Sequence, residues 1–266
     1  DAICLSHLHA DHVAGLPGLF HTVANAGRTE PMRIFGPLGT SDVVSGLRVI
    51  APHLPYEIEV IELEDDVTFG LPGGLTGHAR EGKHRVTCLG YRFTADRGRA
   101  FREDRAVARD IPKEYWSQLQ NGETVIVNEK TVRPDDVLGD LRPGVAIGLV
   151  TDTRPTERLA ELVRGVDLLI CEATYGEDDE LPKAERHGHM TIREASALAE
   201  RAGVGNLWLT HFGAGMSDPE SYRPFARSLF ASAEIGHSGL TGSLTFRRGY
   251  ERTDAVDPAE QPNGEQ

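Results

Sequence analysis

The feature that most constrains this chain is a cluster of metal-ligand residues close to its first residue. The segment Ser6–His12 reads Ser-His-Leu-His-Ala-Asp-His and follows the apolar run 3–5. Histidines two positions apart on an extended segment project to the same side, and the next turn brings the following Asp-His pair to a neighbouring point. Imidazole and carboxylate together suit zinc, and manganese or iron are alternatives. The cluster predicts two adjacent metal ions held by His7, His9, Asp11 and His12.

Apolar runs of strand length alternate with helical patterns, which predicts a layered α/β fold. The expected strands are 2–5, 32–35, 86–93, 146–151, 167–173 and 207–210. Asp152, Glu172 and His211 stand where three of these strands end. Active sites of layered α/β folds usually lie at such ends, so these side chains are candidate site residues.

Three segments have helical patterns. Pro17 suits the first turn of a helix that runs through the amphipathic segment 19–26 to Gly27. Thr40 or Ser41 is expected to cap a helix that ends at Val49. The clearest helix is 191–202, where Thr191 and Glu194 form a capping box and Gly203 ends the helix.

Composition predicts a soluble protein, because 39% of the 266 residues are hydrophobic but no apolar run reaches the roughly 18 residues that a membrane span needs. Cys4, Cys88 and Cys171 are interpreted as buried, reduced thiols of a cytoplasmic protein. The chain begins at Asp1 rather than Met, so we expect that residues before it are missing and that targeting signals cannot be judged.

The net charge of -13 argues against general nucleic-acid binding, which Lys and Arg provide. Part of this charge lies in 251–266, which is expected to be a disordered acidic tail. Thr94–Pro143 looks inserted, and its first part carries Arg97, Arg99, Arg102, Arg105, Arg109 and Lys113. Their spacing suits phosphate contacts, whereas the alternative is a solvated surface anchored by Tyr115-Trp116.

The cluster at 6–12 matches the metal-binding motif of the metallo-β-lactamase superfamily, and the chain from Asp1 to about Arg247 resembles its ribonuclease Z branch. Further matching segments are Gly15–Leu19, Phe35-Gly36-Pro37, His84-Arg85-Val86 and Gly90–Phe93. The resemblance implies a metallo-β-lactamase-like αββα sandwich, truncated at its N-terminus. It would span residues 1–250, with an inserted arm at about 94–143.

The resemblance also implies a complete ligand set for two Zn²⁺ ions. His84 would be the third histidine, and its local competitor, His78, is interpreted as a loop histidine. Thr151–Pro155 resembles the segment whose Asp bridges both metals, and Thr210–Phe212 resembles the last ligand motif. One metal would be held by His7, His9 and His84, the other by Asp11, His12 and His211, with Asp152 shared.

Two more motifs resemble those of ribonuclease Z and point to a phosphodiester as the substrate. Glu172–Thr174 matches the His-Glu-Ala-Thr motif of ribonuclease Z with Cys171 in place of its His, and His189–Thr191 matches its His-Ser-Thr motif with Met at the centre. The resemblance implies that Glu172 holds His189 towards the scissile phosphate and that Asp11 accepts the proton of water. A histidine before a helix N-terminus suits an anionic phosphate, although a histidine near a cap is also common.

The implied function is a zinc-dependent phosphodiesterase that removes 3′ trailers from precursor tRNA and leaves a 3′-hydroxyl. Members of this family form dimers, so a homodimer is one expected assembly. Two other hypotheses remain open: a small-substrate phosphodiesterase or related hydrolase on the same centre, and a non-catalytic RNA-binding relative.

Overall fold

The computed structural model describes residues 1–254, which fold as two compact units. Unit 1 joins Asp1–Thr94 to the chain from Ala146 onward, and unit 2 is Ala95–Val145. The arm expected at about 94–143 overlaps unit 2, while positions 255–266 of the expected tail lie outside the described residues. Among the described helices, none is long and apolar enough to cross a membrane.

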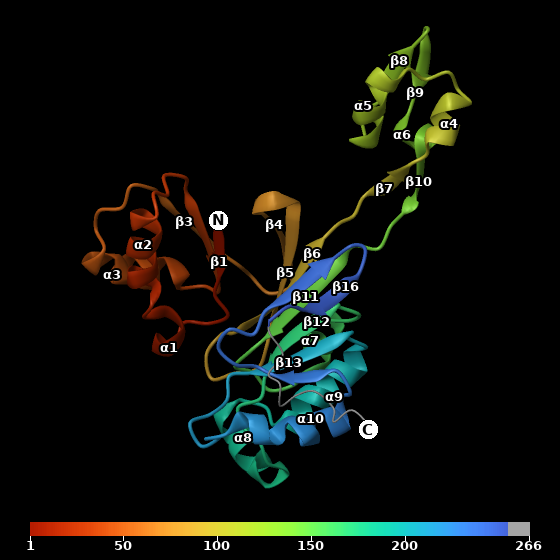
Figure 1. Cartoon of the computed structure of the whole chain (residues 1–266). Coiled ribbons are helices and arrows are strands. Elements are labelled where there is room, and N and C mark those ends of the chain that lie inside the picture. Colours follow the sequence, from red (N-terminus) through yellow and green to blue (C-terminus); the bar gives the residue numbers. More distant parts are fainter. Residues whose placement is uncertain (255–266) are drawn as a thin grey trace. The chain divides into compact units, whose positions relative to one another are not determined.

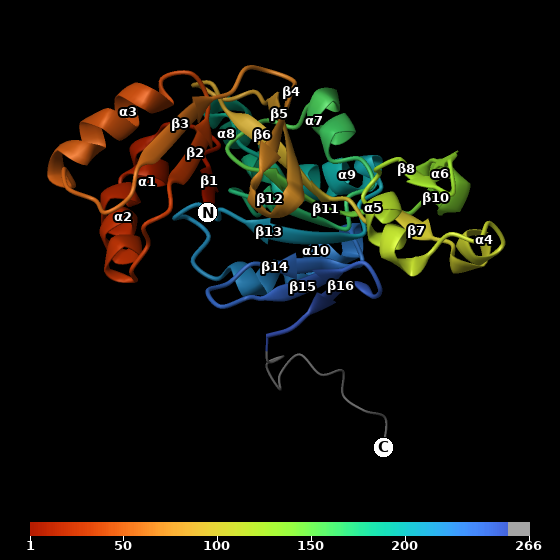
Figure 2. The same ribbon diagram turned by 90° about the horizontal axis from the view of Figure 1, so that it is seen from above.

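The first sheet of unit 1 contains three parallel strands in the order β1-β2-β3. The strands are β1 (Ala2–Cys4), β2 (Met32–Gly36) and β3 (Ile58–Glu62). The helices between them are α1 (Ala10–Val13), α2 (Leu16–Asn25) and α3 (Thr40–Leu47), with a 3₁₀ turn at Arg48–Ile50. Figure 2 shows α2 and α3 beside this sheet.

The second sheet of unit 1 contains seven strands in the order β14-β13-β12-β11-β6-β5-β4. Its strands are β4 (Val67–Leu71), β5 (Leu75–Glu81), β6 (Leu89–Ala95), β11 (Val145–Val150), β12 (Leu168–Glu172), β13 (Asn206–Thr210) and β14 (Ala233–Ile235). The strands β11 to β14 are parallel neighbours, so their carboxyl ends meet at one edge of the sheet.

Helices follow the strands of the second sheet, and Figure 1 shows α9 and α10 next to it. The helices are α7 (Glu157–Leu162), α8 (Leu181–His187), α9 (Ile192–Ala202) and α10 (Arg223–Leu229). Short 3₁₀ turns occupy Pro72–Gly74, Asp178–Glu180 and Pro219–Tyr222. The last described elements are the antiparallel pair β15 (Gly242–Thr245) and β16 (Gly249–Arg252).

Three hydrophobic clusters join these elements into four layers. The first packs α2 and α3 on β1–β3 and includes Phe20 and Ile34. The second lies between the sheets and contains Phe35 and Tyr91, whose hydroxyl donates to the Leu5 carbonyl oxygen at 2.6 Å. The third packs α7, α9 and α10 on β11–β14. The αββα sandwich implied by the resemblance is therefore present.

The helix at 191–202 is confirmed in detail. The Thr191 side chain accepts a hydrogen bond from the Glu194 N–H, the Glu194 side chain caps the Thr191 N–H, and Gly203 ends α9 with φ 63°. The cap expected at Thr40 or Ser41 is wrong, since Gly39 is the N-cap of α3 and Thr40 lies inside the helix. The Thr40 hydroxyl instead donates to the Pro37 carbonyl oxygen, and the helix ends at Leu47.

Three other expectations are corrected. The strand expected from Val86 begins only at Leu89, because Gly82 N–H donates to the Cys88 carbonyl oxygen and closes 82–88 as a loop. His78 is not a loop histidine, since it lies in β5 and contacts Asp66. The expected tail began at 251, but 251–252 belong to β16.

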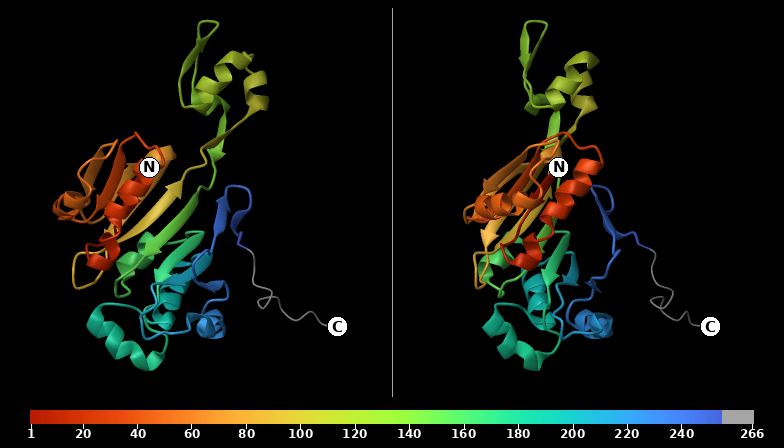
Figure 3. Two further views of the ribbon diagram at one scale, coloured as in Figure 1. Left: turned by 60° about the vertical axis from the view of Figure 1, so that its left-hand side comes forward. Right: turned by 90° about the vertical axis from the view of Figure 1, so that its left-hand side faces the viewer.

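Unit 2 has regular elements and a core of its own. Its elements are β7 (Arg99–Phe101), α4 (Glu103–Val107), a 3₁₀ turn (Lys113–Tyr115), α5 (Trp116–Gln120), β8 (Val125–Val127), β9 (Lys130–Val132), α6 (Pro134–Val137) and β10 (Leu138–Leu141). Both strand pairs are antiparallel, and Figure 3 shows β8–β9 beside the short helices. Leu119 and Val137 are fully buried, and Trp116 packs against this core.

Candidate metal centre

The candidate ligands come from both sheets of unit 1. Those in the segment 7–12 follow β1, and the last two lie in the single turn of α1. His84 lies in the loop between β5 and β6. Asp152 and His211 follow the parallel strands β11 and β13, and Glu172 ends β12 between them. The carboxyl edge of the second sheet therefore faces the histidine cluster of the first.

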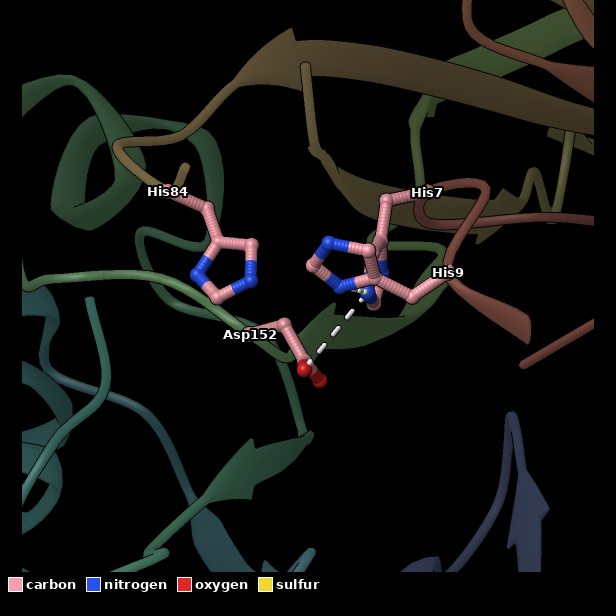
Figure 4. A group of neighbouring side chains, drawn as sticks. All are labelled: His7, His9, His84 and Asp152. Atoms are coloured by element: carbon pink, nitrogen blue, oxygen red, sulfur yellow. Dashed lines mark hydrogen bonds and ion pairs between the residues drawn. The ribbon is translucent and has the colours of Figure 1, made fainter. Parts of the chain in front are cut away.

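The ligand atoms converge in two groups. Atoms of the first group lie within 4.8 Å of one another and come from His7, His9, His84 and Asp152. Figure 4 shows these three imidazoles around the Asp152 carboxylate. The second group is Asp11, His12 and His211, and His189 forms a third, overlapping group with Asp152 and His211. His78 is in none of these groups.

Asp152 contacts side chains of both groups. Its Oδ2 lies 3.6 Å from His7 Nε2, and its Oδ1 lies 3.6 Å from His12 Nε2 and 3.1 Å from His211 Nε2. Only 3% of the residue is exposed, so this carboxylate is directed into the cluster rather than to solvent. One carboxylate thus reaches both sets of imidazoles.

Two of the candidate ligands have an unusual backbone conformation. Asp152 has φ 51° and His211 has φ 56°, the left-handed region that residues other than glycine rarely adopt. Such conformations gather at functional sites, where the surrounding structure holds them in place. Here each one turns a side chain inward directly beyond a buried strand.

A hydrogen bond on the outer side of the His84 imidazole leaves its other nitrogen for a metal. His84 Nδ1 lies 3.0 Å from the Gly188 carbonyl oxygen, to which it donates. His84 Nε2 is buried, and no hydrogen-bond partner is found for it within residues 1–254. A buried nitrogen without a partner is costly in a metal-free site and is explained by a metal bond. The donor set and this nitrogen therefore fit a metal cofactor.

The electrostatics of the cluster favour the protonation states that metal binding needs. Burial lowers the pKa of His7 to about 4, with Asp152 opposing and the neighbouring histidines adding to the shift. Burial also lowers the pKa of His84. Burial alone would raise the pKa of Asp152, but His211 and other partners outweigh it and hold the pKa below its usual value. Neutral imidazole and ionised carboxylate are the forms that bind metal.

The fully buried carboxylate of Glu172 connects the strand ends. It accepts hydrogen bonds from the Thr153 N–H at 2.6 Å and the Met190 N–H at 2.9 Å. It also lies 3.2 Å from His189 Nδ1. Burial lowers the pKa of His189, but the hydrogen bond to Glu172 and its charge outweigh this effect and raise it. Glu172 therefore holds the His189 ring beside the ligand cluster and favours its protonated form.

The sequence interpretation missed two supporting side chains. The Thr174 hydroxyl lies 2.7 Å from Glu172 Oε2, to which it donates, and 3.0 Å from His211 Nδ1. Arg154 donates to the carbonyl oxygen of His189 and to the Glu194 carboxylate. Thr174 and Arg154 lie in the same sequence motifs as Glu172 and Asp152, but only the folded chain brings them to their partners.

The chain matches the family model of the β-lactamase superfamily domain over residues 1–137 and 137–212. It is 43% identical to the ribonuclease Z of Agathobacter rectalis, over 92% of this chain and 81% of that protein. It is also 41% identical to a ribonuclease Z of Clostridium botulinum, over 92% of this chain and 82% of that protein.

Solved structures show the same fold. The metallo-β-lactamase fold protein YhfI from Bacillus subtilis has a TM-score of 0.60 and 21% identity, covering 90% of this chain and 75% of that one. The short form of human tRNase Z has a TM-score of 0.56 and 20% identity, covering 89% of this chain and 76% of that one. The fold agrees with the family model, and the identities to the bacterial relatives show that the chain belongs to the ribonuclease Z family, the endoribonucleases of the metallo-β-lactamase superfamily.

Proposed function

We propose that this chain is the endoribonuclease that removes 3′ trailers from precursor tRNA and leaves a 3′-hydroxyl. The observation that carries the proposal is the position of His189, whose ring centroid lies 5.0 Å from that of His84 and 5.5 Å from that of His211. A proton donor at this position, between the two ligand groups, could protonate the leaving oxygen of a phosphodiester bound there. The relatives named ribonuclease Z support the same reaction.

The proposed cofactor is a pair of zinc ions. His7, His9 and His84 would hold one ion, Asp11, His12 and His211 the other, and Asp152 both. The two groups of ligand atoms support this division. Histidine with carboxylate is a donor set typical of catalytic zinc, and manganese or iron would accept the same ligands.

A centre of this kind supplies, when bound, an activated water and positive charge at the phosphate oxygens. The carboxylate of Asp11 would accept a proton from the attacking water. The Asp11 side chain is 76% exposed and faces His12 at 3.6 Å, so it can exchange that proton with solvent. Its exposure distinguishes it from the buried Asp152, which would hold the cluster.

His189 would donate a proton to the leaving oxygen. The new bond joins the water oxygen to phosphorus, the bond to the ribose O3′ breaks, and the phosphate remains on the trailer. Glu172 would hold His189 through Nδ1, which leaves Nε2 for the substrate. The N-terminus of α9 begins directly after His189 and Met190 and favours negative charge.

Unit 2 is proposed to contact the tRNA backbone, although several of its arginines have internal roles. Arg99 donates to the Gly139 carbonyl oxygen, and Arg105 donates to that of Leu138. Arg109 and Lys130 are exposed and line a hollow between α4 and the β8–β9 pair. These two cations are therefore the phosphate contacts that we propose.

A homodimer and a cytoplasmic location are also proposed. Exposed large hydrophobic side chains in the segment 19–50 include Leu38 at 67%, Val49 at 76% and Ile50 at 73% exposed. Covering such side chains would favour self-association. Sedimentation of the wild-type chain and of Val49→Asp tests this, since a dimer through this surface should dissociate in the variant. The three free cysteines suit a reducing compartment.

The decisive experiment incubates the protein with a 3′-extended precursor tRNA, before and after chelation and zinc replacement. Cleavage at the trailer that is lost on chelation and restored by zinc supports the proposal. Hydrolysis of bis(p-nitrophenyl) phosphate without tRNA cleavage would favour a small-substrate phosphodiesterase, and tRNA binding without cleavage would favour a non-catalytic role. Arg109→Ala should weaken tRNA binding, whereas Arg201→Ala, which removes an exposed cation from α9, should not.

A further inference from the structure

Arg154 lies beside the candidate centre but is not one of its ligands. One nitrogen of its guanidinium, Nη1, donates to the His189 carbonyl oxygen. The same nitrogen lies 2.8 Å from Glu194 Oε2, and Nη2 donates to Glu194 Oε1. The side chain is only 14% exposed, and that of Glu194 is 19% exposed. A planar guanidinium can make this forked set of bonds, which an ammonium group cannot.

Glu194 performs two tasks with one carboxylate. Its Oε2 accepts from the Thr191 N–H at 3.1 Å and so completes the capping box of α9. Both of its oxygens also accept from Arg154. The guanidinium is thereby attached to the first turn of α9, whose N-cap Thr191 lies two residues beyond His189.

Arg154 also belongs to the loop that follows Asp152. Its backbone N–H donates to the Lys83 carbonyl oxygen at 2.9 Å, next to His84 in the chain. The His189 N–H donates to the Ala184 carbonyl oxygen at 2.9 Å, so the His189 backbone is bonded on both sides. Arg154 therefore links the segments that carry Asp152, His84 and His189.

We propose that Arg154, held by Glu194, is a positioning residue that fixes His189 at the scissile phosphate. The inference rests on the proposed function, because it assumes that His189 donates a proton there. The imidazole itself is held through Nδ1 by Glu172 at 3.2 Å. Arg154 adds a charge-assisted bond to the backbone of the same residue and limits how far the ring can shift.

The expected effect is on turnover rather than on substrate binding. Arg154→Gln should lower kcat by about 10- to 100-fold, because displacing a reacting group by about 1 Å has an effect of this size. KM and zinc content should stay close to wild type, since Arg154 is not in either ligand group. Glu194→Gln keeps an oxygen for the Thr191 N–H but loses the charge, and should lower kcat in the same direction.

The test is a double-mutant cycle with His189→Ala, measured on precursor tRNA together with zinc content and melting temperature. If Arg154 acts through His189, Arg154→Gln should lower kcat in the wild-type background and have no further effect in His189→Ala. Arg201→Gln is the matched control: Arg201 lies on α9, as Glu194 does, and its substitution breaks only the exposed ion pair with Glu157 of α7, so kcat should not change. Arg154→Lys keeps the positive charge without the forked set of bonds and should retain only part of kcat.

The outcomes separate the two proposals. An equal loss of kcat in both backgrounds, or a loss of zinc from Arg154→Gln, would show that Arg154 supports the fold or the metals rather than His189. A stable Glu194→Gln with wild-type kcat would overturn the inference even if Arg154→Gln fails to fold. If His189→Ala alone leaves kcat unchanged, the proposed role of His189 itself fails.

Discussion

The Asp152 carboxylate oxygen Oδ1 lies 3.1 Å from His211 Nε2, and both residues have a left-handed backbone. They follow β11 and β13, which lie on either side of β12 in the sheet. The two strained turns therefore bring a carboxylate and an imidazole together across an intervening strand. Because non-glycine residues adopt this conformation at a cost, the pairing indicates that the surrounding structure is arranged for it.

Asp152→Asn should remove bound zinc, because it replaces the charged ligand that the two proposed zinc ions share. The loss of the zinc ions should lower kcat/KM by about 1000-fold or more, which corresponds to several kcal/mol of transition-state stabilisation. Metal content by mass spectrometry and cleavage of precursor tRNA measure both. Asp66→Asn is the matched control, since Asp66 also has positive φ and contacts a histidine, but lies outside both ligand groups. Full zinc content in Asp152→Asn would contradict its role as the shared ligand.

His189→Ala should lower kcat by about 100- to 10,000-fold, the usual contribution of a positioned general acid. The zinc content should not change, because the groups that contain His7 and His12 are complete without His189, although His189 also lies near Asp152 and His211. Single-turnover cleavage with saturating enzyme separates this chemical step from tRNA binding. A variant that turns over at the wild-type rate would assign the proton donor to another group.

Thr174→Val should weaken zinc binding by about 10- to 100-fold, as is typical when a group that orients a ligand is removed. The hydroxyl fixes the His211 ring through Nδ1, and valine keeps its shape without the hydrogen bond. Competition with a chromogenic chelator gives the affinity. Thr210→Val serves for comparison, since the Thr210 hydroxyl donates to the Cys171 carbonyl oxygen rather than to a ligand. Equal affinities in both variants would exclude the orienting role.

The stability of the chelated protein should fall as the pH is lowered from 6.5 to about 4. His7 has a pKa of about 4 in the folded chain because burial lowers it from 6.5. The unfolded chain therefore binds more protons in this window, so the contribution of neutral His7 is complete above pH 6.5 and is lost as the pH approaches 4. Thermal melting of the chelated wild type and of His7→Asn across this range measures the difference. An identical pH dependence in both proteins would disprove the assignment.

Leu207→Ala should destabilise the protein by about 2–5 kcal/mol, the usual effect of truncating a buried leucine. Leu207 is fully buried on β13, the strand that precedes His211. Urea unfolding of Val49→Ala provides the comparison, because that side chain is 76% exposed and should change stability little. A similar loss of unfolding free energy in both variants would show that packing between β13 and the helices contributes less to stability than the burial of Leu207 indicates.

Local sequence patterns were sufficient to predict an element where its position depends on residues close together in the chain. The capping box of α9 and the glycine that ends it were readable because they depend on residues three positions apart or adjacent to the helix end. The alternation of apolar runs likewise identified the parallel strands β11, β12 and β13. By contrast, α3 starts after Gly39, which acts as its N-cap, and β6 starts only after the loop that the Gly82–Cys88 hydrogen bond closes. Residue propensities alone do not locate either boundary.

The segment at 6–12, together with its resemblance to a known family, was enough to name the candidate ligands and predict metal chemistry. Only the tertiary structure decided how they meet: Asp152 reaches both groups, and His84 Nε2 is left buried beside them. Arg154 and Thr174 gained their positions from partners that lie 35 and 37 residues away in the chain. The physical reason is that ligand identity is a local property, whereas the orientation of a ligand depends on hydrogen bonds between strands that only folding brings together.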